Sequence, residues 1–436
     1  MRSLKLIFSL MLIFVIGCAS ADKRFDQGWE MEQQGQYENA AMRYVQALEK
    51  DPSLEEARSR LREVGAMAIA ERMDEAEELV SRGDPASAAA HFRRADGVAA
   101  SARMVGVRLV FPEGYALERR AIFDEAFAAL VESGVTAGEQ GRWEEGLAEF
   151  HEARYELEPS GAQRNRALIE ESNLLLRWSD YEYDRGHLRQ AFYIAEQVQE
   201  LEWTPPDQAA VAAEYMEDYL DEGEVELLVL PVQVQSRTRE NSDHRYALAA
   251  HLETSLQQGP WREPPAFVLL HNPVAVRDLI TQGDILNGDY RPATLALILR
   301  LAGADYAAYM QLLGVESTEF DVRSKTETTK TRSGQSTTFV RETGQRRLQA
   351  EARVIIADSF GNQIADVIVS GMGSAPFSRG SYDGNPDELN LSRNQVDLFD
   401  RFVLESQEQA VREALVRDLS ANISGAVYQP TLAQIP

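Results

Sequence analysis

The side chains most suited to specific chemistry in this 436-residue chain are six histidines and one cysteine. The histidines are scattered along the chain: His91, His151, His187, His244, His251 and His271. His244 and His251 share one face of a predicted helix, but they lie too far apart to hold one metal ion. The chain carries no G-x-S-x-G, G-x-G-x-x-G, H-E-x-x-H or phosphate-loop motif. We therefore expect no enzyme, no cofactor and no metal site; only a pocket of converging polar groups would indicate an activity that these motifs miss.

The single cysteine, Cys18, follows a segment typical of secretion signals. Arg2 and Lys5 precede an apolar run at residues 6–16, and Gly17 comes directly before the cysteine. A run of about 11 residues is too short to span a membrane, which takes roughly 20. We interpret residues 1–17 as a signal peptide. Because no second cysteine is present, the chain can form no internal disulfide.

The ending Val15-Ile16-Gly17-Cys18 resembles the lipobox of bacterial lipoprotein signals. The resemblance implies that Cys18 is acylated, with palmitate or a similar chain, and becomes the first residue of a lipid-anchored mature protein. Ala19 stands where inner-membrane retention signals typically carry aspartate, which favours the outer membrane, with the protein facing the periplasm. An ordinary signal peptide with a chance cysteine is the alternative.

Acidic residues outnumber basic ones in this chain. There are 70 aspartates and glutamates against 44 lysines and arginines, a formal net charge of −26. Removing the signal with Arg2 and Lys5 makes the mature chain still more acidic. Such a surface repels phosphates, so we expect no nucleic acid partner, and it argues against docking on anionic lipid through a basic patch.

Residues 22–221 are predicted to form a series of helices, because apolar residues recur at helical spacing among many alanines, glutamates, leucines and arginines. One pattern recurs: a glycine, a large residue or proline two positions later, then small and aromatic residues. The marker glycines Gly35, Gly83, Gly141 and Gly186 lie 48, 58 and 45 residues apart. Glycine suits the tight turn between paired helices. Residues 107–114 interrupt the pattern.

This pattern resembles the tetratricopeptide repeat (TPR) family, whose copies are usually ~34 residues long. The resemblance implies that residues 18–203 form an all-α domain of helical repeats with a concave protein-binding groove. The wider spacing predicts extra helices or loops between copies. The residues that would face the groove are Phe25, Trp29, Glu32, Asp180 and Tyr183. Plain packing or solvated surface remains the simpler interpretation of each, and a generic helical bundle with glycine turns is the alternative fold.

The composition changes at residues 204–223, which we interpret as a linker and connecting helix, and residues 224–436 then alternate between strand and helix signals. Strands are predicted at residues 225–231, 267–270, 306–315, 348–358 and 364–370. Helices are predicted at residues 243–258, 273–282, 294–301 and 395–425. Along residues 348–358, apolar and polar side chains alternate, which indicates one buried face. The order predicts an α/β domain, a mixed sheet with flanking helices.

Four segments of this second domain resemble the family that includes the curli-secretion lipoprotein CsgG, the penicillin-binding-protein activator LpoB and the N-terminal domain of TolB. They are the opening strand LLVLPV, residues 267–280, the strand entry LAGADYAAY and the hairpin ARVIIADSFG. The resemblance covers roughly residues 224–428. An unrelated α/β domain with similar periodicity is the alternative.

By this resemblance, residues 316–347 are the candidate for the membrane hairpins that the curli channel inserts. A lipid-facing strand needs an apolar residue at every second position. Neither phase of this segment offers such a band beyond Val322. We therefore predict a polar, exposed hairpin or a mobile loop rather than part of a pore, and a surface connection at residues 375–394.

Two interaction-type domains on a lipid tether indicate an adaptor that binds proteins of the cell envelope. By resemblance, the closest role is that of a lipoprotein that docks on a peptidoglycan synthase and activates it. The alternative is an accessory, non-pore component of a curli-like secretion or surface-organelle assembly system. The sequence leaves open which partner is bound and the oligomeric state.

Overall fold

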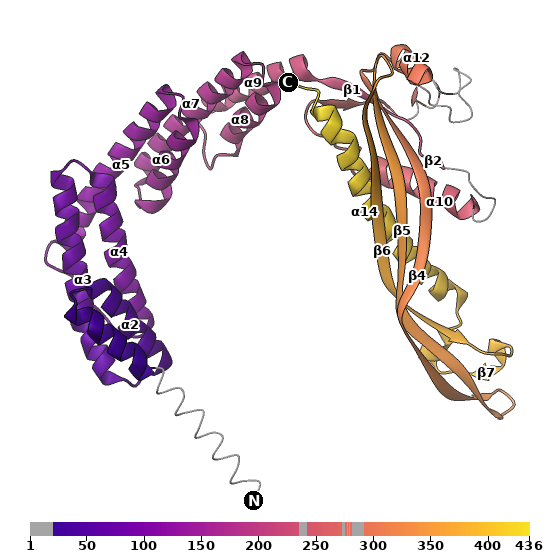
Figure 1. Ribbon diagram of the computed structural model, residues 1–436, viewed down its shortest axis with the longest axis horizontal. Helices are drawn as coiled ribbons and strands as arrows, with labels where there is room; N and C mark the ends of the chain where they lie inside the picture. The colour runs from indigo at the N-terminus through magenta and orange to yellow at the C-terminus, as the bar shows by residue number, and fades with distance from the viewer. Residues whose placement is uncertain (1–20, 235–241, 273–274, 277, 279, 281–291) are drawn as a thin grey trace, which may run out of the picture. The chain divides into compact units, whose positions relative to one another are not determined.

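The computed structural model describes residues 21–234, 242–272, 275–276, 278, 280 and 292–436. The chain divides into a helical unit (Met1–Arg185 and Gln190–Met216) and a sheet unit (Gly186–Arg189 and Glu217–Pro436). The predicted layout, helices followed by an α/β mixed sheet, is confirmed (Figure 1). Cys18 and the predicted signal peptide lie outside the described residues, as does most of the helix predicted at residues 273–282.

The helical unit starts with a helix at residues 21–33, and further helices follow along the chain (Figure 1). These are α2 (Tyr37–Lys50), α3 (Glu55–Ser81), α4 (Pro85–Met104), α5 (Tyr115–Glu139), α6 (Trp143–Glu156), α7 (Gly161–Asp184), α8 (Leu188–Glu200) and α9 (Pro206–Gly223). From α2 to α7 each helix packs on the next helix in the chain. A smaller buried cluster with Leu175, Ile194 and Ala212 joins α7, α8 and α9. The predicted linker and connecting helix at residues 204–223 corresponds to α9, within which the two units divide.

The four marker glycines all form the turns between paired helices. Their φ angles are positive, at 72° for Gly35, 78° for Gly83, 72° for Gly141 and 77° for Gly186. Only glycine adopts this left-handed conformation without a steric penalty. At the second turn the N–H of Asp84 donates to the carbonyl of Leu79 at 3.0 Å, which closes the end of α3 in a Schellman-type bond. The recurring glycine is therefore a requirement of the helix-turn-helix backbone.

Long helices and one irregular segment explain why the glycines are spaced so widely. The first helices of the later pairs, α3, α5 and α7, have 27, 25 and 24 residues. Residues 107–112 are not helical, as the break in the pattern predicted, yet Val107 and Leu109 of this segment are buried in the core. A Cβ on Gly65 of α3 would lie 2.7 Å from Leu109, so the segment packs closely on that helix.

The sheet unit contains one mixed sheet with helices on both faces (Figure 1). Its strands are β1 (Val225–Val229), β2 (Gln233–Val234), β3 (Val268–Leu270), β4 (Tyr306–Thr331), β5 (Ser336–Asp358), β6 (Gln363–Ser381) and β7 (Leu389–Asn390). Its helices are α10 (Ser242–Gln258), α12 (Pro292–Ala302), α13 (Arg393–Val396) and α14 (Arg401–Leu432). The strand order is β3-β1-β4-β5-β6, with β1 parallel to both β3 and β4, and β4, β5 and β6 antiparallel.

The two faces of the sheet are covered by different helices. Ala352 and Val354 of β5 are fully buried, and α14 packs against β5 and β6. Gly373 of β6 permits this contact, because a Cβ there would lie 2.3 Å from the backbone nitrogen of Leu415. α10 lies beside α14, and α12 packs on the opposite face, in a core with Leu228, Ala307 and Ala357 of β1, β4 and β5.

The predicted polar segment at residues 316–347 is an ordered hairpin rather than a mobile loop. β4 and β5 pair from Tyr306 and Asp358 to Lys330 and Ser336, with register shifts between Leu312 and Gly314 and between Phe320 and Arg323. Most side chains of β4 beyond Val315 are exposed, as the polar pattern predicted.

Two predictions about the end of the chain were wrong. Residues 375–394 were expected to form only a surface connection, but residues 375–381 extend β6 and pair with β5. Leu389 is buried and β7 pairs with β4. The last helix, expected at residues 395–425, is instead the short α13 followed by α14, which continues to Leu432. Phe339 of β5 and Phe377 of β6 are buried in this part of the sheet, where their packing stabilises the strands.

Candidate functional site

The first helix pair brings together three of the five predicted groove residues. Phe25, Trp29 and Glu32 lie on the helix at residues 21–33. The Phe25 ring lies 5.4 Å from the ring of Tyr44 on α2, centroid to centroid. The Tyr44 hydroxyl donates to Glu32 Oε2 at 2.7 Å. Gly28, one turn below Glu32, leaves room for this ring, because a Cβ there would lie 2.8 Å from Tyr44.

An arginine from the next helix completes this group. The Arg60 guanidinium of α3 lies 4.3 Å above the Trp29 ring, and its Nη1 lies 3.3 Å from Glu32 Oε1. Burial, and then the hydrogen bond to Glu32, raise the pKa of Tyr44, so its hydroxyl stays protonated. Trp29 remains 39% exposed. We call Phe25, Trp29, Glu32, Tyr44 and Arg60 the first-pair cluster; it presents an aromatic face and an arginine held in place by a carboxylate.

The other two predicted groove residues lie on α7, away from this cluster (Figure 1). Asp180 is exposed, and its charge contributes, after burial, to the raised pKa of Tyr215. Tyr183 is half-buried. The structure therefore does not bring the five residues into one site.

A second aromatic group on α6 and α7 escaped the sequence analysis. Trp143 and Trp178 stack with ring centroids 6.3 Å apart and planes at 8°, and the Tyr181 ring lies 5.6 Å from that of Trp143. Arg185 lies 5.3 Å from the Tyr181 ring. Trp178 and Tyr181 are three residues apart on α7, so their shared helix face was the available signal.

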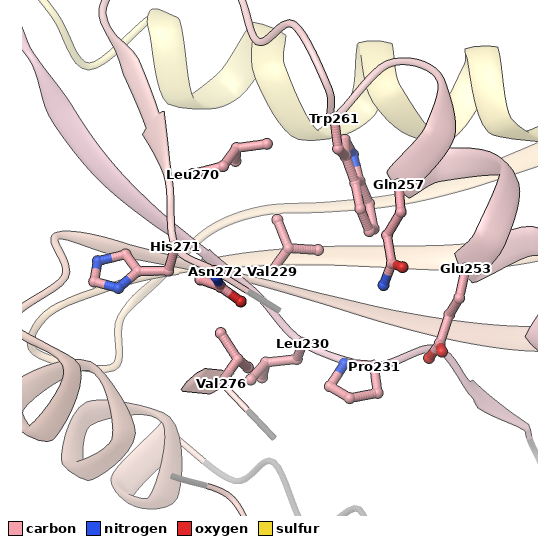
Figure 2. A pocket seen from close by; sticks show the side chains of 10 residues that line it. All are labelled: Val229, Leu230, Pro231, Glu253, Gln257, Trp261, Leu270, His271, Asn272 and Val276. Carbon is pink, nitrogen blue, oxygen red and sulfur yellow. The ribbon is translucent and has the colours of Figure 1, made fainter. Parts of the chain in front are cut away.

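The sheet unit holds a pocket of about 370 Å³ at the ends of β1 and β3 (Figure 2). Val229 ends β1 and Pro231 follows it, Leu270 comes from β3, and Glu253 and Gln257 come from α10. Trp261 follows α10 in a turn in which its backbone N–H donates to the carbonyl of Leu256 at 2.9 Å. Figure 2 shows Glu253, Gln257 and Trp261 on the same side of the pocket, while the ring of His271 extends away from them.

Hydrogen bonds fix two of the polar groups around this pocket. Glu253 Oε1 accepts from the backbone N–H of Val232 at 2.7 Å, which ties α10 to the segment after β1. His271 Nε2 lies 2.7 Å from Glu226 Oε2 of β1. The sequence analysis predicted the strands that end here, but not the pocket, because its walls come from three separate segments.

The described residues contain no group of three or more histidine, cysteine, aspartate or glutamate side chains placed to hold a metal ion. Within the same part of the chain, no helix is long and apolar enough to cross a membrane.

Comparisons with known proteins yield little. No protein-family model matches the chain, and no curated protein matches it. Among solved structures the chain is similar to the crystal structure of lipoprotein GNA1162 from Neisseria meningitidis, at 14% identity and a TM-score of 0.20, over 37% of this chain and 88% of that chain. A TM-score this low carries no argument about fold or function.

Proposed function

We propose that this chain is a lipoprotein, held to the outer membrane by lipid on Cys18 and facing the periplasm, that acts as a non-enzymatic adaptor for other envelope proteins. The lipobox-like sequence supports the anchor. The TPR-like helix pairs support the adaptor role, because stacked helical repeats present extended binding surfaces.

The observation that carries the proposal is the first-pair cluster. Tryptophan and arginine are enriched among the residues that dominate binding energy at protein interfaces. Trp29 is partly exposed, and Arg60 is already oriented by Glu32, so little side-chain entropy would be lost on binding. A partner with an acidic or aromatic patch would fit this surface.

The closest specific role is activation of a peptidoglycan synthase, which rests on the resemblance to the penicillin-binding-protein activator and is fold-level analogy. An accessory role in a curli-like secretion system is the alternative hypothesis. The two differ in assembly: an activator can act as a monomer in a one-to-one complex, whereas a secretion component would form a large homo-oligomer with secretion proteins.

The test is immunoprecipitation of the lipidated protein from detergent-solubilised envelopes, followed by sizing of the complex. Trp29→Ala should reduce the recovered partner about tenfold or more. Trp203→Ala is the matched control, because Trp203 is similarly exposed, at 42% against 39% for Trp29, and lies outside the cluster. Equal recovery with both variants would contradict binding at the cluster.

The anchor is tested separately by Cys18→Ser. This variant should lose acyl-chain labelling and move from the membrane fraction to the periplasmic extract. A protein that stays in the membrane fraction without acyl label would refute the lipid anchor.

A further inference from the structure

Large apolar side chains are exposed where α4 ends and α5 begins. Met104 is 81% exposed, Val110 77% and Leu117 81%, and Phe111 is exposed as well. Phe111 and Leu117 line one hollow of about 730 Å³, and Arg103, the neighbour of Met104, lines the same hollow. We call the four apolar residues the α4–α5 patch. Apolar surface gathered in this way marks contact with a protein or a membrane.

The lipid proposed on Cys18 is close in the chain to the first packed residue. Ala21, in the helix at residues 21–33, is only 1% exposed, so the fold is packed from this residue on. The chain from Cys18 to Ala21 spans at most about 11 Å even when fully extended. The anchor therefore holds this end of the helix next to the lipid surface. This step rests on the lipid anchor of the proposed function.

Three other chain segments lie at the same end of the helical unit as Ala21. Arg24, in the first turn after Ala21, donates to Gln46 near the end of α2. Arg58 Nη2, in the first turn of α3, donates to the carbonyl of Pro52 at 2.6 Å. A Cβ on Gly106, just after α4, would lie 3.6 Å from Arg58 Nη1. The ends of α2 and α4 and the start of α3 thus lie at this end, which we call the anchor end.

The rest of the patch is also close to the anchor end. Leu109 packs on Gly65, which is ten residues, about 15 Å, from the start of α3. The Tyr115 hydroxyl donates to Asp96 at 2.9 Å, and Asp96 is eight residues, about 12 Å, from the end of α4. Measured along the helices, the patch therefore lies within about 15 Å of the anchor end, where the lipid tether can bring it to the bilayer.

The charges beside the patch do not oppose contact with anionic headgroups. The exposed charged residues between positions 103 and 117 are Arg103, Arg108 and Glu113, so basic residues outnumber acidic ones. Neither arginine side chain is paired with an acidic residue in the part of the chain that the structure describes. The chain as a whole carries a net charge of −26, and this region is a local exception to it.

We propose that the α4–α5 patch is a second membrane contact, which enters the interface of the same bilayer that holds the lipid of Cys18. The apolar side chains leave water for the boundary between headgroups and acyl chains, and Arg103 and Arg108 reach the headgroup phosphates. The tether keeps the patch at high local concentration near the bilayer, so that a few side chains suffice. The contact fixes the orientation of the helical unit on the membrane, with the first helix pair close to the lipid.

The experiment measures the depth of single fluorescent labels in the acylated full-length protein. The vesicles contain phosphatidylethanolamine and phosphatidylglycerol, with or without nitroxide-bearing lipids that quench a nearby fluorophore. Cys18 is the only cysteine, and acylation blocks its thiol, so one introduced cysteine gives one labelling site. Leu117→Cys places the label in the patch. The control Ser81→Cys places it at the exposed last residue of α3, about 39 Å from the start of that helix.

The label at Leu117→Cys should be quenched by the nitroxide lipids and shift its emission to the blue, whereas the label at Ser81→Cys should do neither. Adding Met104→Glu and Val110→Glu should reduce the quenching at Leu117→Cys to the level at Ser81→Cys. Both side chains are so exposed that the melting temperature should not change. The matched control, Gln34→Glu with Gln36→Glu, adds two negative charges at the Gly35 turn and should leave the quenching intact.

Acyl labelling of Cys18 on the same preparation separates the two hypotheses. An acylated protein whose label at Leu117→Cys stays unquenched would overturn the patch contact and leave the anchor in place. A protein without acyl label would overturn the anchor and this inference with it. Protection of the label that appears only after envelope proteins are added would assign the patch to a protein partner, and the membrane contact would be wrong.

Discussion

Arg154 of α6 and Glu171 of α7 form a buried ion pair whose removal should show how the helix pairs are held together. The side chains are 7% and 8% exposed. Arg154 Nη2 donates to Glu171 Oε1 at 3.3 Å, while Arg154 Nε and Glu171 Oε2 lie 3.2 Å apart outside hydrogen-bond geometry. The pair is therefore buried but incompletely hydrogen-bonded, a state in which the desolvation cost can exceed the Coulombic gain.

We expect Arg154→Met to destabilise the helical unit by about 3–5 kcal/mol, because Glu171 is left as an uncompensated buried charge. The double variant Arg154→Met with Glu171→Leu should be within about 1 kcal/mol of the original chain, or more stable than it, because neither charge remains to be desolvated. The coupling between the two positions should thus be about 2 kcal/mol or more.

Urea unfolding followed by tryptophan fluorescence measures these changes, since Trp143 and Trp178 stack across the same two helices. Hydrogen exchange of peptides from α6 and α7 assigns the effect to them, because a chain of two units need not unfold in one step. A loss below about 1 kcal/mol for Arg154→Met, the size expected of an exposed pair, would refute the reasoning.

The same variant has a pH signature. Burial raises the pKa of Glu171, and Arg154 opposes that rise. Without the arginine the folded-state pKa should rise further above the unfolded value of about 4.3. A carboxyl whose folded pKa is raised stabilises the fold below the unfolded pKa and loses that contribution as the pH rises through the folded pKa. Arg154→Met should therefore regain stability on mild acidification, and a flat pH profile would contradict a buried, unpaired Glu171.

Three further changes test other contacts. Arg353→Gln should raise the pKa of Asp366 from about 2 toward its ordinary 3.8, because it removes the arginine hydrogen bonds to that carboxylate. These bonds stabilise the fold at neutral pH, and their contribution is lost as the pH falls through about 2. A carboxyl NMR titration measures the shift, and an unchanged titration would disprove it. Gly373→Ala should cost about 1–3 kcal/mol in urea unfolding, whereas Gly425→Ala, in open space on α14, should add about 0.5–1 kcal/mol; losses of equal size would rule out close packing of α14. Asp84→Ala should cost about 1 kcal/mol by removing the cap of α4, and an unchanged midpoint would argue against that cap.

The helix pairs were predictable because their signals are local. A glycine with positive φ, such as Gly35 or Gly141, ends one helix and sets up the next within a few residues. Gly28 adds a contact that is also short-range in sequence, since Tyr44 follows it by only 16 positions. The lengths of α3, α5 and α7 were not predictable in the same way, because a long helix continues as long as its neighbours bury one face of it.

The part of the sheet that contains residues 316–331 was harder to predict, because its signals are not local. Residues 316–331 of β4 are mostly exposed, so alternation between buried and exposed positions, the usual strand signal, is absent. The anchors that order this part, Phe339 and Phe377, lie on β5 and β6. The pocket was equally hidden, because Val229, Glu253 and Leu270 become neighbours only when β1, α10 and β3 assemble.

The edge strand of the sheet also bears on how a partner would bind. An exposed edge is a template for strand addition. Along β6, however, α14 satisfies the outward backbone: Asp418 accepts from the N–H of Met372 at 2.8 Å, and Asn422 donates to the carbonyl of Ser370 at 2.8 Å. Further along, Gln407 accepts from the N–H of Ser378 at 2.9 Å. A strand added along this stretch would have to displace these side chains. Partner recognition by a side-chain surface such as the first-pair cluster therefore costs less than pairing with this edge.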